Sequence, residues 1–140
     1  MSVEENKASA RRVIEEVFNK RNLTVTDELI DPTYIYHVPG GIDFKGVEGF
    51  KQFVNMYLTA FPDMHATIEG IVAEGDIVAI RVTYTGTHNG ELMGIAPTGK
   101  QLNMTGAVFS RFSGGKQVEA WPYADQLTMY QQLGIPIPSE

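Results

Sequence analysis

Asp125 and His37 are the side chains of this 140-residue sequence whose types and positions best suit acid–base chemistry. Asp125 follows Trp121, the sole tryptophan, by four residues and stands where a strand is expected to meet the last helix. A carboxyl group with an apolar surround can remove a proton next to a carbonyl and then protonate the product. Aspartate is also a preferred helix N-cap. The pattern therefore supports two roles for Asp125, acid–base catalyst and helix cap, which can coexist.

His37 lies near the end of a short β-rich run, TYIYHV at 33–38. Strand alternation puts Tyr34 and Tyr36 on one face and His37 on the other. Its two readings are a catalytic assistant and a partly buried histidine bonded to backbone. The sequence has three widely spaced histidines and no cysteine, which matches no metal-ligand pattern. We therefore expect no metal site.

Bulky side chains near these positions could hold a substrate, although each could equally be core packing. Arg81 stands in a strongly apolar strand, so it needs a partner, either a cross-strand carboxylate or an oxygen of the substrate. The sequence predicts these substrate-binding residues: Phe18, Tyr57, Arg81, Met104, Trp121 and Tyr123.

The elements that must position these residues follow a simple order. Helical spacing predicts a helix that starts at the capping box Ser2–Glu5, a short helix near 24–30 and a third helix over 47–61. Alternation then predicts strands over 65–73, 77–87, 100–112 and 117–123, with a last helix over 125–133. Long twisted strands curl around the helices, so we expect an α+β cone with an internal pocket. The loop 89–99 is long enough to be a lid.

Composition limits the possible partners. The length suits one domain, 1–140, and a net charge of −6 without a basic cluster excludes a nucleic-acid partner. No apolar run approaches the roughly 20 residues that span a membrane, and the N-terminus lacks the apolar core of a signal peptide. We expect a cytoplasmic protein.

The sequence resembles the SnoaL-like polyketide cyclases of the nuclear-transport-factor-2-like (cystatin-like cone) superfamily. The segments that carry the resemblance are EEVFNKRNL at 15–23, LIDPTYIYHVPG at 29–40, GVEGFKQFV at 46–54, AFPDMHATIE at 60–69, VAEGDIVAIRVTYTGTHNGELMGIAPTGK at 72–100, and FSRFSGGKQVEAW, the later aspartate and QQLG up to Gly134. The resemblance implies a curved antiparallel sheet wrapped around N-terminal helices, a homodimer, no cofactor, and a small hydrophobic substrate.

The resemblance also implies an intramolecular aldol ring closure with Asp125 as acid–base catalyst. His37 occupies the place of an acidic base in the related steroid isomerases, so it should point into the cone. Two departures stand out. Ile14, Phe18 and Val108 replace the polar groups by which those isomerases stabilise an enolate, and Ala120 stands where many cyclases have a histidine. Three alternatives remain: an isomerisation on the same cone, a non-catalytic dimer that binds an apolar ligand, and an epoxide hydrolase-like hydration.

Overall fold

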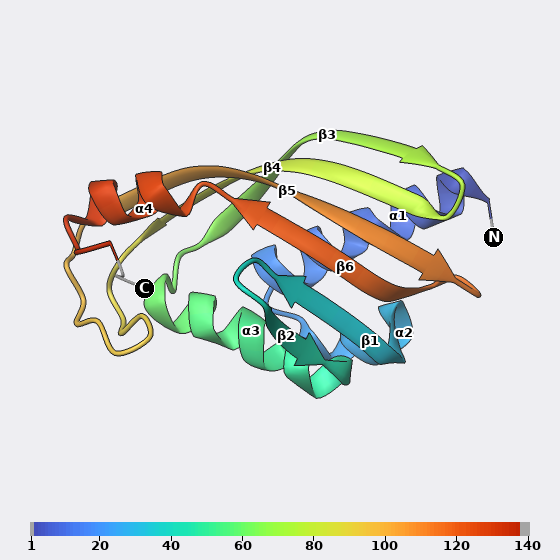
Figure 1. Cartoon of the computed structure of the whole chain (residues 1–140), viewed down its shortest axis with the longest axis horizontal. Helices are drawn as coiled ribbons and strands as arrows, with labels where there is room; N and C mark the ends of the chain where they lie inside the picture. Colours follow the sequence, from blue (N-terminus) through green and yellow to red (C-terminus); the bar gives the residue numbers. More distant parts are fainter. Residues whose placement is uncertain (1, 138–140) are drawn as a thin grey trace.

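The computed structural model describes residues 2–137, so residues 1 and 138–140 of the predicted single domain lie outside it. Over the described residues, a six-stranded curved sheet wraps around helices and confirms the predicted α+β cone (Figure 1). The helices are α1 (Val3–Arg12), α2 (Thr26–Leu29), α3 (Gly46–Ala60) and α4 (Gln126–Leu133). The strands are β1 (Ile30–Val38), β2 (Ile42–Lys45), β3 (His65–Glu74), β4 (Ile77–Thr87), β5 (Gln101–Ser113) and β6 (Lys116–Ala124). Within residues 2–137, no helix is both long and apolar enough to cross a membrane.

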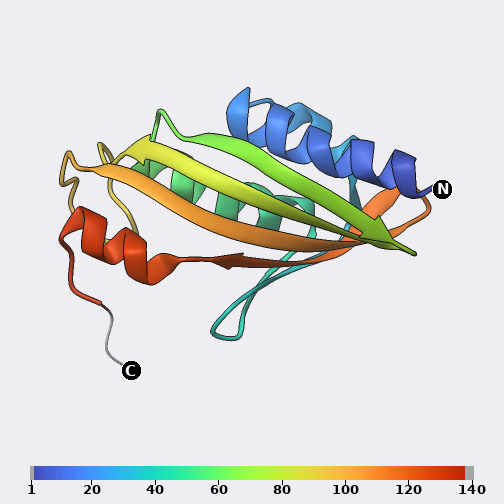
Figure 2. The same cartoon turned by 90° about the horizontal axis from the view of Figure 1, so that it is seen from above.

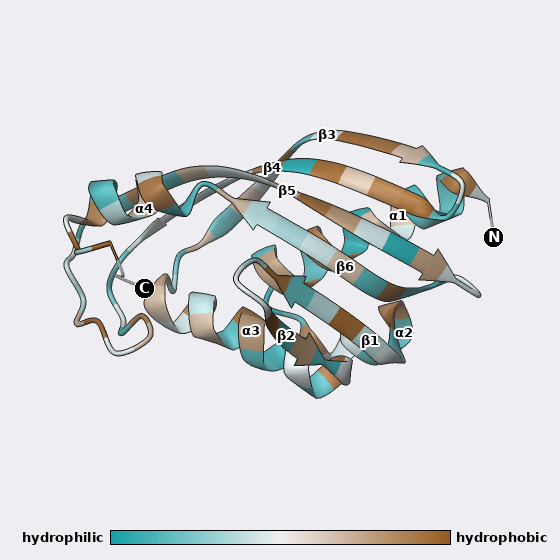
Figure 3. Cartoon of the chain, in the orientation of Figure 1, coloured by the Kyte–Doolittle hydropathy of each residue, from teal (hydrophilic) through white to brown (hydrophobic). Residues whose placement is uncertain are grey.

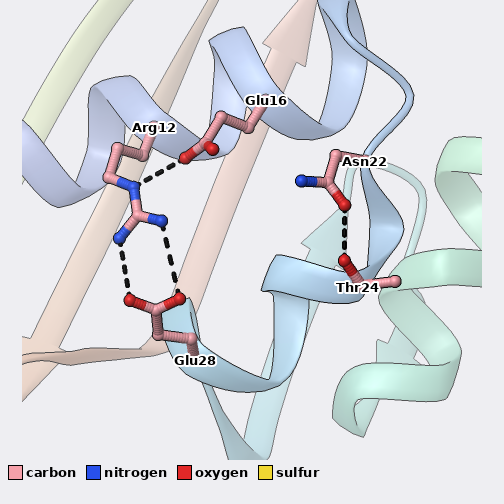
Figure 4. Close-up of polar contacts among 5 residues, drawn as sticks. All are labelled: Arg12, Glu16, Asn22, Thr24 and Glu28. Carbon is pink, nitrogen blue, oxygen red and sulfur yellow. Dashed lines mark hydrogen bonds and ion pairs between the residues drawn. The ribbon is translucent and has the colours of Figure 1, made fainter.

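The N-terminal helix begins as its capping sequence predicts. Ser2 accepts the N–H of Glu5, and the Glu5 carboxylate accepts the N–H of Ser2. Beyond α1, the helical path continues as a π-helix over Val13–Asn19, a feature that the 3.6-residue spacing does not predict. Arg12 joins this helix to α2 by donating to Glu16 and to Glu28 at 2.6 and 3.0 Å (Figure 4).

The sheet has the strand order β2-β1-β6-β5-β4-β3. Strands β3 to β6 form the predicted antiparallel meander, whereas β1 pairs with β6 in parallel. Strand β2, which was not predicted, pairs with β1 through a turn at Pro39, Gly40 and Gly41. Both glycines have positive φ, 101° and 80°, so this turn favours residues without a side chain.

Two clusters of buried side chains form the interior. The larger joins α1, the π-helix, α3 and the inner faces of the strands, with Phe50 only 1% exposed at its centre. The smaller lies where α4, the end of α3 and the loop before β5 meet, and it contains Leu92, Leu102 and Met129. Figure 2 shows α1 lying along one side of the sheet and α4 at the end of the sheet. In Figure 3, hydrophobic colour is concentrated along β3 and β4.

The loop between β4 and β5, which the sequence suggests as a lid, is anchored at its start to the end of α3. Leu92 and His88 are fully buried, and the N–H groups of Asn89 and Gly90 both donate to the carbonyl of Ala60. A Cβ at Gly90 would lie 1.8 Å from the carbonyl oxygen of Thr59, so only glycine allows this approach. The start of the loop is therefore held against the end of α3.

Candidate functional site

An apolar cavity of about 100 Å³ opens between α3, the inner face of the sheet and the start of α4. Its lining is largely aromatic and aliphatic, and within the described residues it includes no charged side chain. The lining residues are Phe18, Tyr36, Val38, Pro39, Phe53, Tyr57, Met64, Tyr84, Met104, Ala107, Pro122, Tyr123, Ala124 and Gln126. Such a lining suits a small hydrophobic compound with few polar atoms.

Four tyrosines and Gln126 are the polar side chains among the residues that line this cavity. Burial raises the pKa of Tyr36 well above its usual value and, with a smaller effect from the neighbouring Tyr57, raises the pKa of Tyr84 to about 12. Burial also raises the pKa of Tyr57, although a hydrogen bond with Gln126 opposes the change. These phenols therefore keep their protons at neutral pH and can donate hydrogen bonds to a guest oxygen.

Asp125 is the N-cap of α4 and stands between two lining residues, Ala124 and Gln126. Its carboxylate accepts the N–H of Thr128 at 3.2 Å and the hydroxyl of Thr128 at 2.6 Å. The side-chain bond to Thr128 and then the backbone bond lower the pKa of Asp125, whereas a catalytic carboxyl group in an apolar wall would have a raised pKa. The capping role is present, and the carboxylate is exposed, ionised and not among the side chains that line the cavity.

His37 lies on the outer face of the sheet, which corrects the expectation that it points into the cone. Strand alternation gives the inward positions of β1 to Tyr36 and Val38, which line the cavity. The ring of His37 stacks on Trp121 at 5.5 Å between centroids. Its Nδ1 is 3.1 Å from Asp43 and its Nε2 is 2.8 Å from Glu119. Asp125 and His37 are therefore not brought together.

The remaining predicted binding residues divide between the two faces of the sheet. Phe18, Tyr57 and Met104 lie along the cavity, as expected for a binding role, whereas Tyr123 borders both the cavity and the outer hollow beside Phe109 and is 53% exposed. Trp121 lies instead over a shallow hollow on the outer face, because Ala120 and Pro122 take the inward positions of β6.

Arg81 is exposed on the outer face of β4, so an apolar strand accommodates it without a substrate oxygen.

The sequence reasoning missed Tyr36, Tyr84 and Gln126 among the lining residues. The alternation of TYIYHV could have revealed Tyr36, since it opposes His37. Within residues 2–137, no group of three or more histidine or acidic side chains is arranged to hold a metal ion.

The outer-face histidine predicts a pH-dependent contribution to stability. Two carboxylates face its two ring nitrogens, so His37 binds both only as the doubly protonated cation. Burial opposes this charge, but the hydrogen bonds to Glu119 and Asp43 outweigh it and raise the pKa of His37. A raised folded-state pKa gives stability that is complete below the ordinary histidine value of about 6.5 and is lost as the pH rises through the folded pKa.

We therefore expect His37→Gln to destabilise the protein most near pH 6, by on the order of 1 kcal/mol, and progressively less in mildly alkaline solution. Urea unfolding across this pH range measures the difference. His65→Gln, at an exposed histidine of β3, is the matched control and should show no such trend. A destabilisation by His37→Gln that is constant with pH would contradict the cationic assignment.

The fold is an α+β cone with an apolar internal cavity, as in proteins that bind small hydrophobic compounds, and comparisons with known proteins identify the family. The family model described as SnoaL-like polyketide cyclase matches residues 8–133, so the chain belongs to that family. Aklanonic acid methyl ester cyclase AcmA of Streptomyces galilaeus is 30% identical over 135 residues, covering 94% of this chain and 92% of the relative.

Solved structures agree with this assignment. IdmH of Streptomyces antibioticus, a proposed polyketide cyclase, is 36% identical with a TM-score of 0.81, covering 93% of this chain and 99% of that one. A proposed SnoaL-like polyketide cyclase from Jannaschia sp. CCS1 has a TM-score of 0.89 at 20% identity, covering 96% and 94%, and supports the fold alone. The chain is thus a SnoaL-like protein of the polyketide cyclase type.

Proposed function

We propose that this protein closes a ring by an intramolecular aldol reaction on a neutral, hydrophobic carbonyl compound held in the cavity. The observation that carries the proposal is the cavity itself, with its apolar walls and its protonated tyrosine hydroxyls. Aldol ring closure needs only a base, an acid and a geometry that brings two carbons of one molecule together.

In this proposal the base is Asp125, which stands in the chain between the lining residues Ala124 and Gln126. Its carboxylate removes a proton from the carbon next to a carbonyl, which leaves an enolate. The enolate carbon attacks a second carbonyl carbon of the same molecule, a carbon–carbon bond forms, and the carbonyl π pair becomes an alkoxide. The alkoxide takes the proton back from the Asp125 carboxyl group, so the reaction is neutral overall. Hydroxyls of Tyr57 and Tyr84 donate hydrogen bonds to the oxygens on which negative charge develops.

Substrate charge offers a direct test of the proposed site. Because the lining contains no cation within the described residues, a carboxylate placed there would lose its hydration without gaining a partner. The relative AcmA is named for the methyl ester of aklanonic acid. We expect this protein to bind aklanonic acid methyl ester at least about tenfold more tightly than the free acid, a difference of about 1.4 kcal/mol. Titration calorimetry measures both affinities, and equal affinities would contradict a cavity site.

A non-catalytic ligand-binding role is the second candidate. The two bonds from Thr128 to Asp125 favour it, because a carboxylate engaged in capping is a weaker base than one free in an apolar wall. A substitution that removes the charge of Asp125 but keeps the helix cap separates the two candidates.

We also propose that two copies of the chain associate through the outer face of the sheet. Val72, Phe109 and Tyr123 are exposed there by 69%, 42% and 53%. Strand pairing puts Val72 beside Ala79, Ala79 beside Phe109, and Phe109 beside Trp121, which makes one apolar row across four strands. An exposed apolar row of this kind marks an interaction surface, and a twofold pair of identical copies is the simplest way to cover it.

Sedimentation velocity tests this association. We expect the wild-type protein to sediment as two chains at micromolar concentration and Trp121→Arg to sediment as one. Leu127→Arg changes a 51%-exposed leucine on α4 instead and should leave two chains together. A wild-type protein that sediments as a single chain would overturn the proposal.

A further inference from the structure

A smaller chamber lies beside the cavity, deeper in the cone. This inner chamber of about 20 Å³ lies between the N-terminal helices and β1, β4, β5 and β6. Phe18, Tyr36 and Tyr84 line both spaces, so their side chains stand between the cavity and the chamber. A flat ring that packs against these three aromatic residues would direct a substituent into the chamber.

The wall of the inner chamber carries buried polar side chains. Ser110 of β5 and Gln117 of β6 are each 3% exposed, and Tyr34 of β1 is 1% exposed. The rest of the wall is aliphatic or aromatic apart from the two tyrosines that it shares with the cavity. A buried hydroxyl or amide is stabilised by a hydrogen-bond partner, so this wall favours a polar guest atom over a methyl group.

The size of the chamber and the lack of charge in its wall limit the kind of chemical group that it can bind. A space of about 20 Å³ holds one water molecule or one small substituent. Within the described residues, the wall has no charged side chain to balance an ion. Serine, glutamine and tyrosine can each donate and accept a hydrogen bond, which suits a hydroxyl or carbonyl oxygen.

We propose that the inner chamber, through Tyr34, Ser110 and Gln117, binds a neutral hydroxyl or ketone oxygen at one end of the ligand. This contact sets the orientation of the ligand in the cavity. This inference rests on the proposed ligand-binding cavity and adds a specificity site to it. It requires no bond to form or break.

Matched probes test the chamber without knowledge of the natural substrate. 2-Naphthol and 2-methylnaphthalene have nearly the same shape, but only the first carries a hydroxyl group. We expect Ser110→Ala and Gln117→Met each to weaken 2-naphthol binding by about 3- to 10-fold, the effect of losing one neutral hydrogen bond. Binding of 2-methylnaphthalene should change by less than about twofold. Ligand-detected NMR titration measures all affinities, and thermal unfolding checks that each variant is folded.

Gln101→Met, at an exposed glutamine of β5, is the matched control and should alter neither affinity. If Gln117→Met does not fold, Ser110→Ala carries the test from the neighbouring strand. Equal weakening of both probes, or no weakening of 2-naphthol, would overturn the specificity site while leaving the cavity as a binding site. Failure of the wild-type protein to bind either probe would overturn the cavity proposal as well.

Discussion

Asp125→Asn is expected to lower kcat for aldol ring closure by about 100-fold or more, while the melting temperature stays within about 2 °C of the wild type. Asparagine caps helices as well as aspartate does, and its amide oxygen can still accept the N–H of Thr128. The substitution therefore removes the base and keeps the cap, and general acid–base catalysis contributes about 10²- to 10⁴-fold. A steady-state assay with aklanonic acid methyl ester, paired with thermal unfolding, measures both quantities.

Asp125→Ala is the companion variant because it removes both roles. We expect the same loss of kcat together with a loss of about 1 kcal/mol in the free energy of unfolding, the usual effect of removing a cap. An active Asp125→Asn variant beside a destabilised Asp125→Ala variant would mean that Asp125 only caps α4. The ligand-binding role would then be the better account of the cavity.

Phe50→Ala is expected to lower the free energy of unfolding by about 3–5 kcal/mol, the range for a large aromatic residue removed from a core. Phe50 is 1% exposed and packs edge-on against Tyr34 and Tyr36, with centroids 5.6 and 5.4 Å away. It supports the same tyrosines that line the cavity and its inner chamber. The substitution removes these aromatic contacts and leaves a void that the packed helix–sheet interface cannot fill completely.

Urea unfolding measures the effect of Phe50→Ala. Leu127→Ala, at a half-exposed position of α4, is the control and should change the free energy of unfolding by less than about 0.5 kcal/mol. A loss below about 1 kcal/mol for Phe50→Ala would contradict the central place of this side chain in the core.

Residue patterning predicts much of this fold because each element has one buried side. The run from Ile77 to Thr87 is rich in apolar and β-branched residues and follows a turn, and its predicted bounds match those of β4. The cap of α4 at Asp125 and its left-handed end at Gly134 also follow from residue type. The strand β2 was missed because four residues after a Pro-Gly-Gly turn carry too little periodicity, and its pairing depends on β1.

The site was harder to predict than the fold because it depends on which face of each strand turns inward. Alternation gives two faces but does not say which one is inside. The resemblance to steroid isomerases led His37 to be placed inside, yet Tyr36 occupies that side and His37 pairs with Glu119 outside. Trp121 was predicted to bind substrate for the same reason, but its neighbour Pro122 takes the inward position of β6 and lines the cavity.

A crystal structure of the protein with bound aklanonic acid methyl ester tests most directly the claim that the apolar cavity is the site of binding and ring closure. We expect the ligand to lie between Tyr57 and Met104, with one carbonyl oxygen about 3 Å from a tyrosine hydroxyl. A ligand bound over Trp121 and Phe109 on the outer face, with the cavity empty, would contradict the claim.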